Sequence, residues 1–364
     1  IGGVNKTLNI IKYIFNVISP FVIGAFIAFI LYPLVRFFYR HLFKEKCHLK
    51  SDKLSKYLSI LITYIIAIGI TILMVFIIPQ LYTSITDIVD KLPVWYNNIT
   101  DLVNSFEDKH ADLGFIDYAV INEQLNNLYP KVISYLTDML TNLLPYVVNT
   151  SMAIVKGLVN LIIAIMVSVY MISDHKNIFY NFKRVLYAVF PKNAADTTRK
   201  ICRESGTIFL KFMYGKALDS LIIGIICFIC MTIFKFPYTV LISVIVGITN
   251  MIPYFGPYIG GVMGGIIIVI VNPIQVIFFA ILILVIQQFD GLFLGPKILG
   301  ESTGLKPLWV IFAIVVGGAL FGVLGMFLGV PVMAVICYIT NLVVEHFLKK
   351  RNISVQPYDS PDEM

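Results

Sequence analysis

Three carboxylic acids lie in or at the edges of strongly apolar runs of the sequence, where a charged group is costly. They are Asp219, Asp290 and Glu345. Within a membrane an Asp costs at least about 2.5–3.5 kcal/mol on insertion scales, so such residues are candidates for exchanging a proton or a cation. The alternative interpretation places all three at the headgroup level, where water solvates them. Asp219 is the strongest single candidate for carrying a coupling proton or cation.

Amide side chains accompany these acids. Gln287 and Gln288 precede Asp290, and Asn250 precedes a proline- and glycine-rich sequence at 253–257. An amide inside an apolar run must pair with another helix or line water. Helices broken at this sequence would direct free backbone N–H and C=O groups into a cavity, where they could hold a polar solute or a cation. The alternative is that the amides only tie helices together.

Several patterns resemble enzyme sites but occur in the wrong context. Residues 300–304 match G-x-S-x-G in a loop between apolar runs, whereas a hydrolase elbow needs a strand-to-helix turn and a His partner. An aspartyl protease pair would need Asp219 and Asp290 close together, which their neighbouring residues do not predict. The five histidines lack metal-ligand spacing, and no Walker-type glycine loop occurs. We therefore expect no enzyme activity, no metal site and no cofactor.

The composition is that of a membrane protein. Of 364 residues, 58% are apolar and 13% are charged, against about 25% charged in soluble domains. The mean hydropathy is +0.86. These values exclude a soluble enzyme and a disordered protein. The net charge of +7 is concentrated in loops between apolar runs, which is typical of cytoplasmic loops, and we expect no nucleic-acid partner.

The distribution of charge predicts the topology of the first half. Apolar runs long enough to cross a membrane occur at about 13–35, 57–79, 145–171 and 217–234. Residues 36–56 contain seven basic and two acidic residues, and residues 174–216 contain nine and three. Both loops are predicted to be cytoplasmic, whereas the acidic segment between them is predicted to form an extracellular helical cap. This orientation places residue 1 outside and predicts a further span upstream of Ile1.

Two helical hairpins are predicted in the second half. Each consists of two apolar arms that are too short to cross a hydrocarbon core about 30 Å thick. The arms are 238–252 with 258–271, and 307–320 with 326–340. Such irregular backbone persists at membrane depth only where protein buries it or it lines a cavity, so we predict two re-entrant hairpins.

The two hairpin units resemble each other at an offset of 70 residues. This shift aligns Pro237 with Pro307, Gly247 with Gly317 and Met263 with Met333. Each unit contains one span and one hairpin, so the second copy would enter the membrane upside down. An inverted repeat of this kind is typical of secondary transporters. It also predicts a cytoplasmic C-terminus, in agreement with the basic residues 349–351.

The predicted fold class is therefore an all-α polytopic membrane protein of the plasma membrane. Its predicted parts are N-terminal spans (1–80), the extracellular cap (81–145), a span with a basic cytoplasmic loop (146–216), the transport unit (217–345) and a cytoplasmic tail (346–364).

Around the acids and amides named above, residues from about 206 to 345 specifically resemble the AI-2E family of membrane transporters, and a looser resemblance covers nearly the whole chain. The matching sequences are Asn250 to Pro257, Gln287 to Gly291, Gly295 to Gly300 and Gly304 to Trp309, with Gly215 to Asp219 upstream and Gly317, Gly318, Gly322, Gly325 and Pro331 downstream. The resemblance is closest to members from Gram-positive bacteria. It implies export of small solutes such as the quorum-sensing signal autoinducer-2, Na⁺(Li⁺)/H⁺ antiport in other members, and a homo-oligomer with a pentamer as the leading expectation.

We interpret the sequence as a secondary transporter that exports a small polar solute. Membrane lipid and a solute, monovalent cation or proton are its expected partners. The predicted pathway residues are Asn250, Pro253, Tyr254, Gly256, Pro257, Gln287, Gln288, Asp290, Gly322 and Gly325, with Asp219 as the coupling residue. The first alternative is a Na⁺(Li⁺)/H⁺ antiporter, and the second is a membrane scaffold that does not transport.

Overall fold

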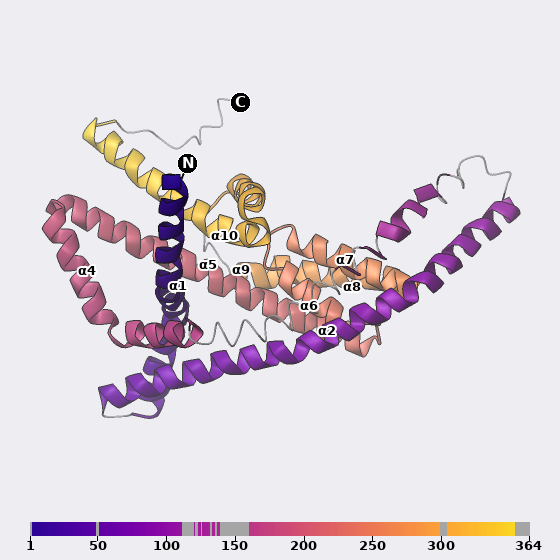
Figure 1. Cartoon of the computed structure of the whole chain (residues 1–364), viewed down its shortest axis with the longest axis horizontal. Helices are drawn as coiled ribbons and strands as arrows, with labels where there is room; N and C mark the ends of the chain where they lie inside the picture. The colour runs from indigo at the N-terminus through magenta and orange to yellow at the C-terminus, as the bar shows by residue number, and fades with distance from the viewer. Residues whose placement is uncertain are drawn as a thin grey trace. The chain divides into compact units, whose positions relative to one another are not determined.

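The computed structural model is all-helical, and Figure 1 shows the order of its elements. It describes residues 2–48, 51–110, 160–298 and 304–353, together with short stretches between 120 and 138. The chain divides into two compact units, Ile1–Val189 and Phe190–Met364. Among the described residues, five helices are long and apolar enough to cross a membrane, or six if one bent pair counts as a single span. The prediction of an all-helical chain with several candidate spans is confirmed.

The first unit is built from a few long helices. They are α1 (Gly2–Phe37), the π-helix η1 (Phe38–Lys46), α2 (Asp52–His110), a helix at Asn160–Ser173 and α4 (His175–Val189). The last two helices are bent by 78° relative to each other. An apolar cluster joins α1, α2 and the 160–173 helix through Ala28, Val35, Ile60 and Ile172.

Helix α2 is longer than the apolar pattern predicts. The hydropathy of the sequence indicates an end near Pro79, but one helix continues to His110 with Pro79 and Pro93 inside it. Prolines are tolerated in long apolar helices because neighbouring groups can satisfy the freed carbonyls. The amphipathic segment after Pro79 buries Ile85, Ile88 and Leu92 as part of this same helix. Most of 111–159, including the start of the predicted span at 145–171, lies outside the described residues.

The second unit holds the predicted transport segment. Its elements are α5 (Lys192–Ile233), α6 (Thr239–Thr249), α7 (Gly256–Val271), α8 (Gln275–Phe289), the π-helix η2 (Asp290–Leu294), α9 (Gly295–Ile298) and α10 (Pro307–Lys350). Helices α5, α6, α7 and α8 lie side by side (Figure 1). Their shared core is fully buried and contains Ile223, Met231, Ile242, Val246, Ile268 and Phe279.

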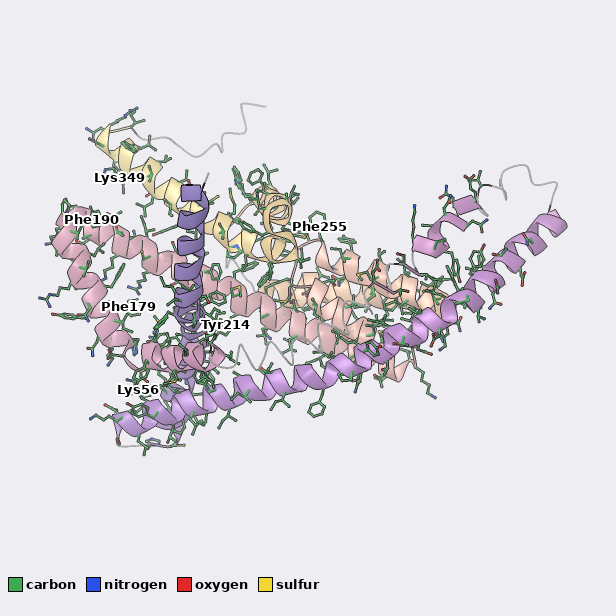
Figure 2. The ribbon with its side chains drawn as sticks, viewed as in Figure 1. Lys56, Phe179, Phe190, Tyr214, Phe255 and Lys349 are labelled. Atoms are coloured by element: carbon green, nitrogen blue, oxygen red, sulfur yellow. The ribbon has the colours of Figure 1, made fainter. Side chains whose placement is uncertain are left out.

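Helices α6 and α7 form an antiparallel hairpin. Its turn contains Tyr254, whose φ is 63°, and Phe255, labelled in Figure 2. A Cβ on Gly256 would lie 1.9 Å from the Thr249 carbonyl oxygen, and a Cβ on Gly260 would lie 3.0 Å from Val246 Cα. The glycines of α7 therefore allow its backbone to contact α6 directly.

Helix α10 folds back on itself at Gly322, where φ is 61° and ψ is −144°. A Cβ on Gly317 would lie 2.2 Å from the Gly325 carbonyl oxygen, and a Cβ on Gly329 would lie 2.4 Å from the Ala313 carbonyl oxygen. Residues eight apart on a straight helix are separated by about 12 Å, so these contacts require a reversal of the chain. An L-residue rarely adopts the backbone of Gly322, which explains glycine at this position.

Both predicted hairpin segments thus fold back at the sequences that indicated them, which are rich in proline and glycine at 253–257 and contain two glycines at 321–325. Their re-entrant position in a membrane, the inverted relation of the two units and the predicted domain boundaries stay predictions. The G-x-S-x-G residues 300–303 and the tail 354–364 lie outside the described residues.

Candidate functional site

A buried ion pair joins two residues on one face of α5. Lys216 and Asp219 are three residues apart, a spacing that brings side chains together on a helix. Lys216 Nζ donates a hydrogen bond of 2.7 Å to Asp219 Oδ2. The side chains are 7% and 0% exposed, respectively. Taking charges out of water is expensive unless they are paired and hydrogen-bonded, so this pair is a costly feature of the fold.

Asn250 connects this ion pair to the first hairpin. It follows the last residue of α6, and its backbone N–H donates to the Val246 carbonyl at 3.0 Å. Its side-chain Nδ2 donates to Asp219 Oδ2 at 3.1 Å, and Asn250 is 0% exposed. The same carboxylate oxygen thus accepts from both Lys216 and Asn250. The side-chain nitrogen of Asn250 therefore joins the end of α6 to α5, which is the helix-tying role that the alternative interpretation gave to this amide.

Asp290 adds a second carboxyl to the group. It is the first residue of η2, directly after α8, and is 9% exposed. Its carboxyl interacts electrostatically with that of Asp219 and with the Lys216 ammonium. The expectation that the sequence does not bring these two acids together is wrong, because the packing of α8 against α5 does so. Short π-helical segments such as η2 occur frequently at functional sites.

We call Lys216, Asp219, Asn250 and Asp290 the carboxyl cluster. Three of its buried oxygens accept no hydrogen bond from the described residues: Asp219 Oδ1, Asn250 Oδ1 and Asp290 Oδ1. If both acids are ionised, the cluster carries two negative charges and one positive charge. A buried uncompensated charge is strongly unfavourable. One additional proton or monovalent cation would neutralise the cluster and engage its free oxygens.

The cluster also depends on a close approach of α5 and α6. A Cβ on Gly224 would lie 3.4 Å from Gly247 Cα, and a Cβ on Gly247 would lie 3.3 Å from Gly224 Cα. Ser220, one residue beyond Asp219, is buried and its hydroxyl has no hydrogen-bond partner among the described residues. A Cβ at either position would meet the facing glycine at close to ordinary van der Waals distance, so only side chains longer than that of alanine would separate the helices that carry Asp219 and Asn250.

The other predicted residues of the first hairpin lie in its turn. Tyr254 is 55% exposed, whereas Gly256 is buried against Thr249. Pro253 and Pro257 are half-buried. Gly256 is thus required for closing the hairpin, a reason that does not involve a solute. A role of the turn in a solute pathway stays a prediction.

The remaining predicted residues are dispersed. Gln287 is half-buried, and its side-chain Nε2 has no hydrogen-bond partner among the described residues. Gln288 is exposed. Gly322 is exposed at the turn of α10, and Gly325 is buried against Gly317. Glu345 is exposed, and its solvation by water at the headgroup level stays a prediction. The structure therefore brings together Asp219, Asn250 and Asp290 from the predicted set.

Lys216 is the member of the carboxyl cluster that was not among the residues predicted from the sequence. Its sequence signal is a Lys three residues before Asp219 at the start of an apolar run. A basic residue at that spacing is a natural counter-ion for a buried acid.

Comparison with known proteins identifies the family. A model of the AI-2E family transporters matches residues 6–345. The chain belongs to the AI-2E transporter family. All four residues of the carboxyl cluster lie within the matched AI-2E region.

Relatives of this AI-2E family protein are named for transport. YueF of Bacillus subtilis (strain 168), named as a transport protein, is 28% identical over 350 residues, which are 94% of this chain and 88% of YueF. YrrI of the same strain, also named as a transport protein, is 27% identical over 346 residues, with 94% and 89% coverage. PerM of Escherichia coli (strain K12), named as a permease, is 24% identical over 336 residues, with 90% and 88% coverage.

Proposed function

We propose that this AI-2E family protein is a secondary transporter that exports a small polar solute across the plasma membrane, with autoinducer-2 as the first candidate. The observation that carries this proposal is the carboxyl cluster, a buried group of charges inside helices apolar enough to cross a membrane. Ionisable groups at such positions are functional by default. The names of the relatives support transport as the general activity.

The charge balance of the cluster provides the coupling. Lys216 compensates one carboxylate, so one proton or monovalent cation is required to compensate the other. In its absence the net negative charge favours a conformation that admits water to the cluster, because solvation lowers the cost of the charge. Binding of the cation favours the closed, buried conformation. A bound charge thereby shifts the population of two conformations, which is the requirement for coupled transport.

The moving element is the first hairpin. Asp219 is on α5, whereas Asn250 is at the end of α6, and a single hydrogen bond of 3.1 Å joins the two side chains. A change in the charge of Asp219 alters this bond and the contact of α5 with α6 at Gly224 and Gly247. The solute pathway lies next to the turn at 253–257, with the turn at Gly322 and Gly325 on its other side and Gln287 and Gln288 at its cytoplasmic end.

A Na⁺(Li⁺)/H⁺ antiporter is the second candidate function. The free oxygens of Asp219, Asn250 and Asp290 favour it, because oxygen atoms are the ligands that small hard cations take. In this case the cation and the proton compete for the cluster, and no organic solute is needed. A scaffold without transport has no use for a buried charged cluster, which argues against the third interpretation.

Reconstitution into proteoliposomes separates these functions. The vesicles contain autoinducer-2 on one side, and pH and Na⁺ gradients are imposed in separate experiments. Solute flux that responds to one gradient supports the exporter and identifies its coupling ion. Proton movement driven by Na⁺ without solute supports the antiporter. If either flux occurs and the variants Asp219→Asn and Asp290→Asn leave it unchanged, the proposed coupling site is refuted. If neither flux occurs, autoinducer-2 export and cation/proton antiport are both refuted.

A further inference from the structure

The short helix α4 has the composition of a membrane-surface helix. At about 100° per residue, its apolar side chains occupy an arc of roughly 120° on the helix. This arc contains Ile178, Phe179, Phe182, Val185, Leu186 and Val189. The rest of the helix surface carries Lys176, Lys183 and Arg184, and α4 contains no Asp or Glu. A helix with one apolar face, a basic polar face and aromatic residues is typical of helices that lie in a lipid interface.

Protein covers very little of the apolar side of α4. Leu186 is buried, but Phe179, Phe182, Val185 and Val189 are 55–68% exposed. Figure 2 labels Phe179 on this helix and shows side chains projecting outward along its length. A soluble protein would not leave such a stripe in water, because burying one large apolar side chain gains about 1.5–3 kcal/mol. The stripe therefore requires an apolar environment outside the chain.

The preceding helix gives α4 the orientation of an interfacial helix. The helix at Asn160–Ser173 is apolar, and α4 follows it at an angle of 78°. If the first helix runs along the membrane normal, α4 is close to the membrane plane. The helix at Asn160–Ser173 ends where the predicted cytoplasmic loop, rich in Lys and Arg, begins.

The bend between the two helices is held by specific contacts. Lys56 of α2 donates a hydrogen bond to the Ser173 carbonyl, and His175 Nδ1 contacts the Ile172 carbonyl at 2.9 Å. The Asn177 side chain donates to Asp174 Oδ1 at 2.7 Å at the start of α4. The His175 ring also packs on Tyr32 of α1 with centroids 4.9 Å apart. The direction of α4 is thus fixed by the rest of the first unit.

We propose that α4 lies in the headgroup layer of the cytoplasmic leaflet and binds anionic phospholipid through Lys176, Lys183 and Arg184. Its phenylalanine and valine side chains enter the acyl-chain boundary, and its basic side chains extend to the phosphates. The positive charge of α4 and the negative charge of this leaflet select lipid as the occupant of the exposed stripe. The inference is independent of the solute that the protein carries.

Quenching by brominated lipid tests the position of α4. A full-length variant with Trp95 and Trp309 replaced by phenylalanine receives one tryptophan, either Phe182→Trp in the apolar arc or Tyr180→Trp on the opposite side. Both proteins are placed in nanodiscs with brominated acyl chains. The proposal predicts about twofold or greater quenching at position 182 compared with position 180. Equal quenching, or none at 182 because protein covers it, would overturn the proposal.

Lipid selection tests the charge. Nanodiscs of phosphatidylcholine with a minority of phosphatidylglycerol are used to measure the enrichment of the anionic lipid around the protein. The variant Lys176→Gln/Lys183→Gln/Arg184→Gln should lose enrichment by up to about a hundredfold, since each of the three basic residues near an anionic surface contributes about a fivefold change in partition and the factors multiply. The matched variant Lys349→Gln/Lys350→Gln/Arg351→Gln removes the same charge elsewhere. An equal loss in both variants would show a general effect of charge and refute a site on α4.

Discussion

The ammonium of Lys216 and the carboxylate of Asp219 form a 2.7 Å ion pair that is almost completely shielded from solvent. The same carboxylate oxygen accepts from Asn250 at 3.1 Å. A second acid, Asp290, interacts with both charged groups. This arrangement compensates one carboxylate within the protein, and under the proposed function a proton or cation from outside compensates the second.

Removing one member of the ion pair should destabilise the protein more than removing both charges. Asp219→Asn removes the 2.7 Å partner of the buried Lys216 ammonium and leaves only Asp290 to compensate it, so the loss should approach about 3–5 kcal/mol, which is typical of a broken buried pair. Lys216→Gln leaves Asp219 and Asp290 without compensation and should cost a similar amount. The double variant Lys216→Gln/Asp219→Asn should recover a large part of the loss. The free energy of unfolding in mixed micelles with increasing SDS measures this double-mutant cycle, and additive losses would contradict the coupling.

Asp290→Asn should reduce coupled flux by about tenfold or more, equivalent to about 1.4 kcal/mol in the coupled step, while the protein stays folded. The variant removes the carboxyl that needs an external cation, so solute movement should no longer follow an imposed gradient. Glu345→Gln is the matched control, because Glu345 is an exposed acid of the same unit. Gradient-dependent flux that survives in Asp290→Asn, or is lost equally in Glu345→Gln, would remove Asp290 from the mechanism.

The α10 hairpin should be destabilised when a side chain is added at the close contact between Gly317 and Gly325. A Cβ on Gly325 would lie 1.9 Å from the Gly317 carbonyl oxygen, so Gly325→Ala must separate the two arms. We expect a loss of about 1–3 kcal/mol in unfolding free energy, as for other overpacked contacts. Gly69→Ala is the control, because no atom lies within 4 Å of its added Cβ. Helical propensity alone predicts that the unfolding free energy of this control is about 0.5–1 kcal/mol higher than that of the wild type. Equal changes in unfolding free energy in Gly325→Ala and Gly69→Ala would contradict the described hairpin.

Tyr254 offers a way to separate a structural role from a pathway role. Its φ of 63° is unfavourable for a tyrosine, and its side chain is 55% exposed. Tyr254→Gly should therefore leave the unfolding free energy unchanged or raise it by up to about 1–2 kcal/mol. If Tyr254 lines the solute pathway, the same variant lowers the maximal flux although the protein is at least as stable. Unchanged flux in the variant would place Tyr254 outside the pathway.

The sequence predicted the elements better than their contacts. Apolar run length, the Pro/Gly sequence at 253–257 and the two glycines of 321–325 indicated long helices and two hairpins, because these patterns are local. The partnership of Asp219 with Asp290 was not predictable, since it depends on how α8 packs on α5. Lys216 was within reach of prediction, because its spacing from Asp219 is local. The continuation of α2 beyond Pro79 was missed because a proline inside an apolar helix resembles a helix end in sequence.

The most direct test of the central claim is the number of external charges that the carboxyl cluster binds. Proton release or uptake on addition of the transported cation or solute is measured with a pH dye on the purified protein, for the wild type, Asp290→Asn and Glu345→Gln. We predict that about one proton per chain is exchanged in the wild type and in Glu345→Gln, and none in Asp290→Asn. Equal exchange in all three proteins would contradict the assignment of the carboxyl cluster as the coupling site.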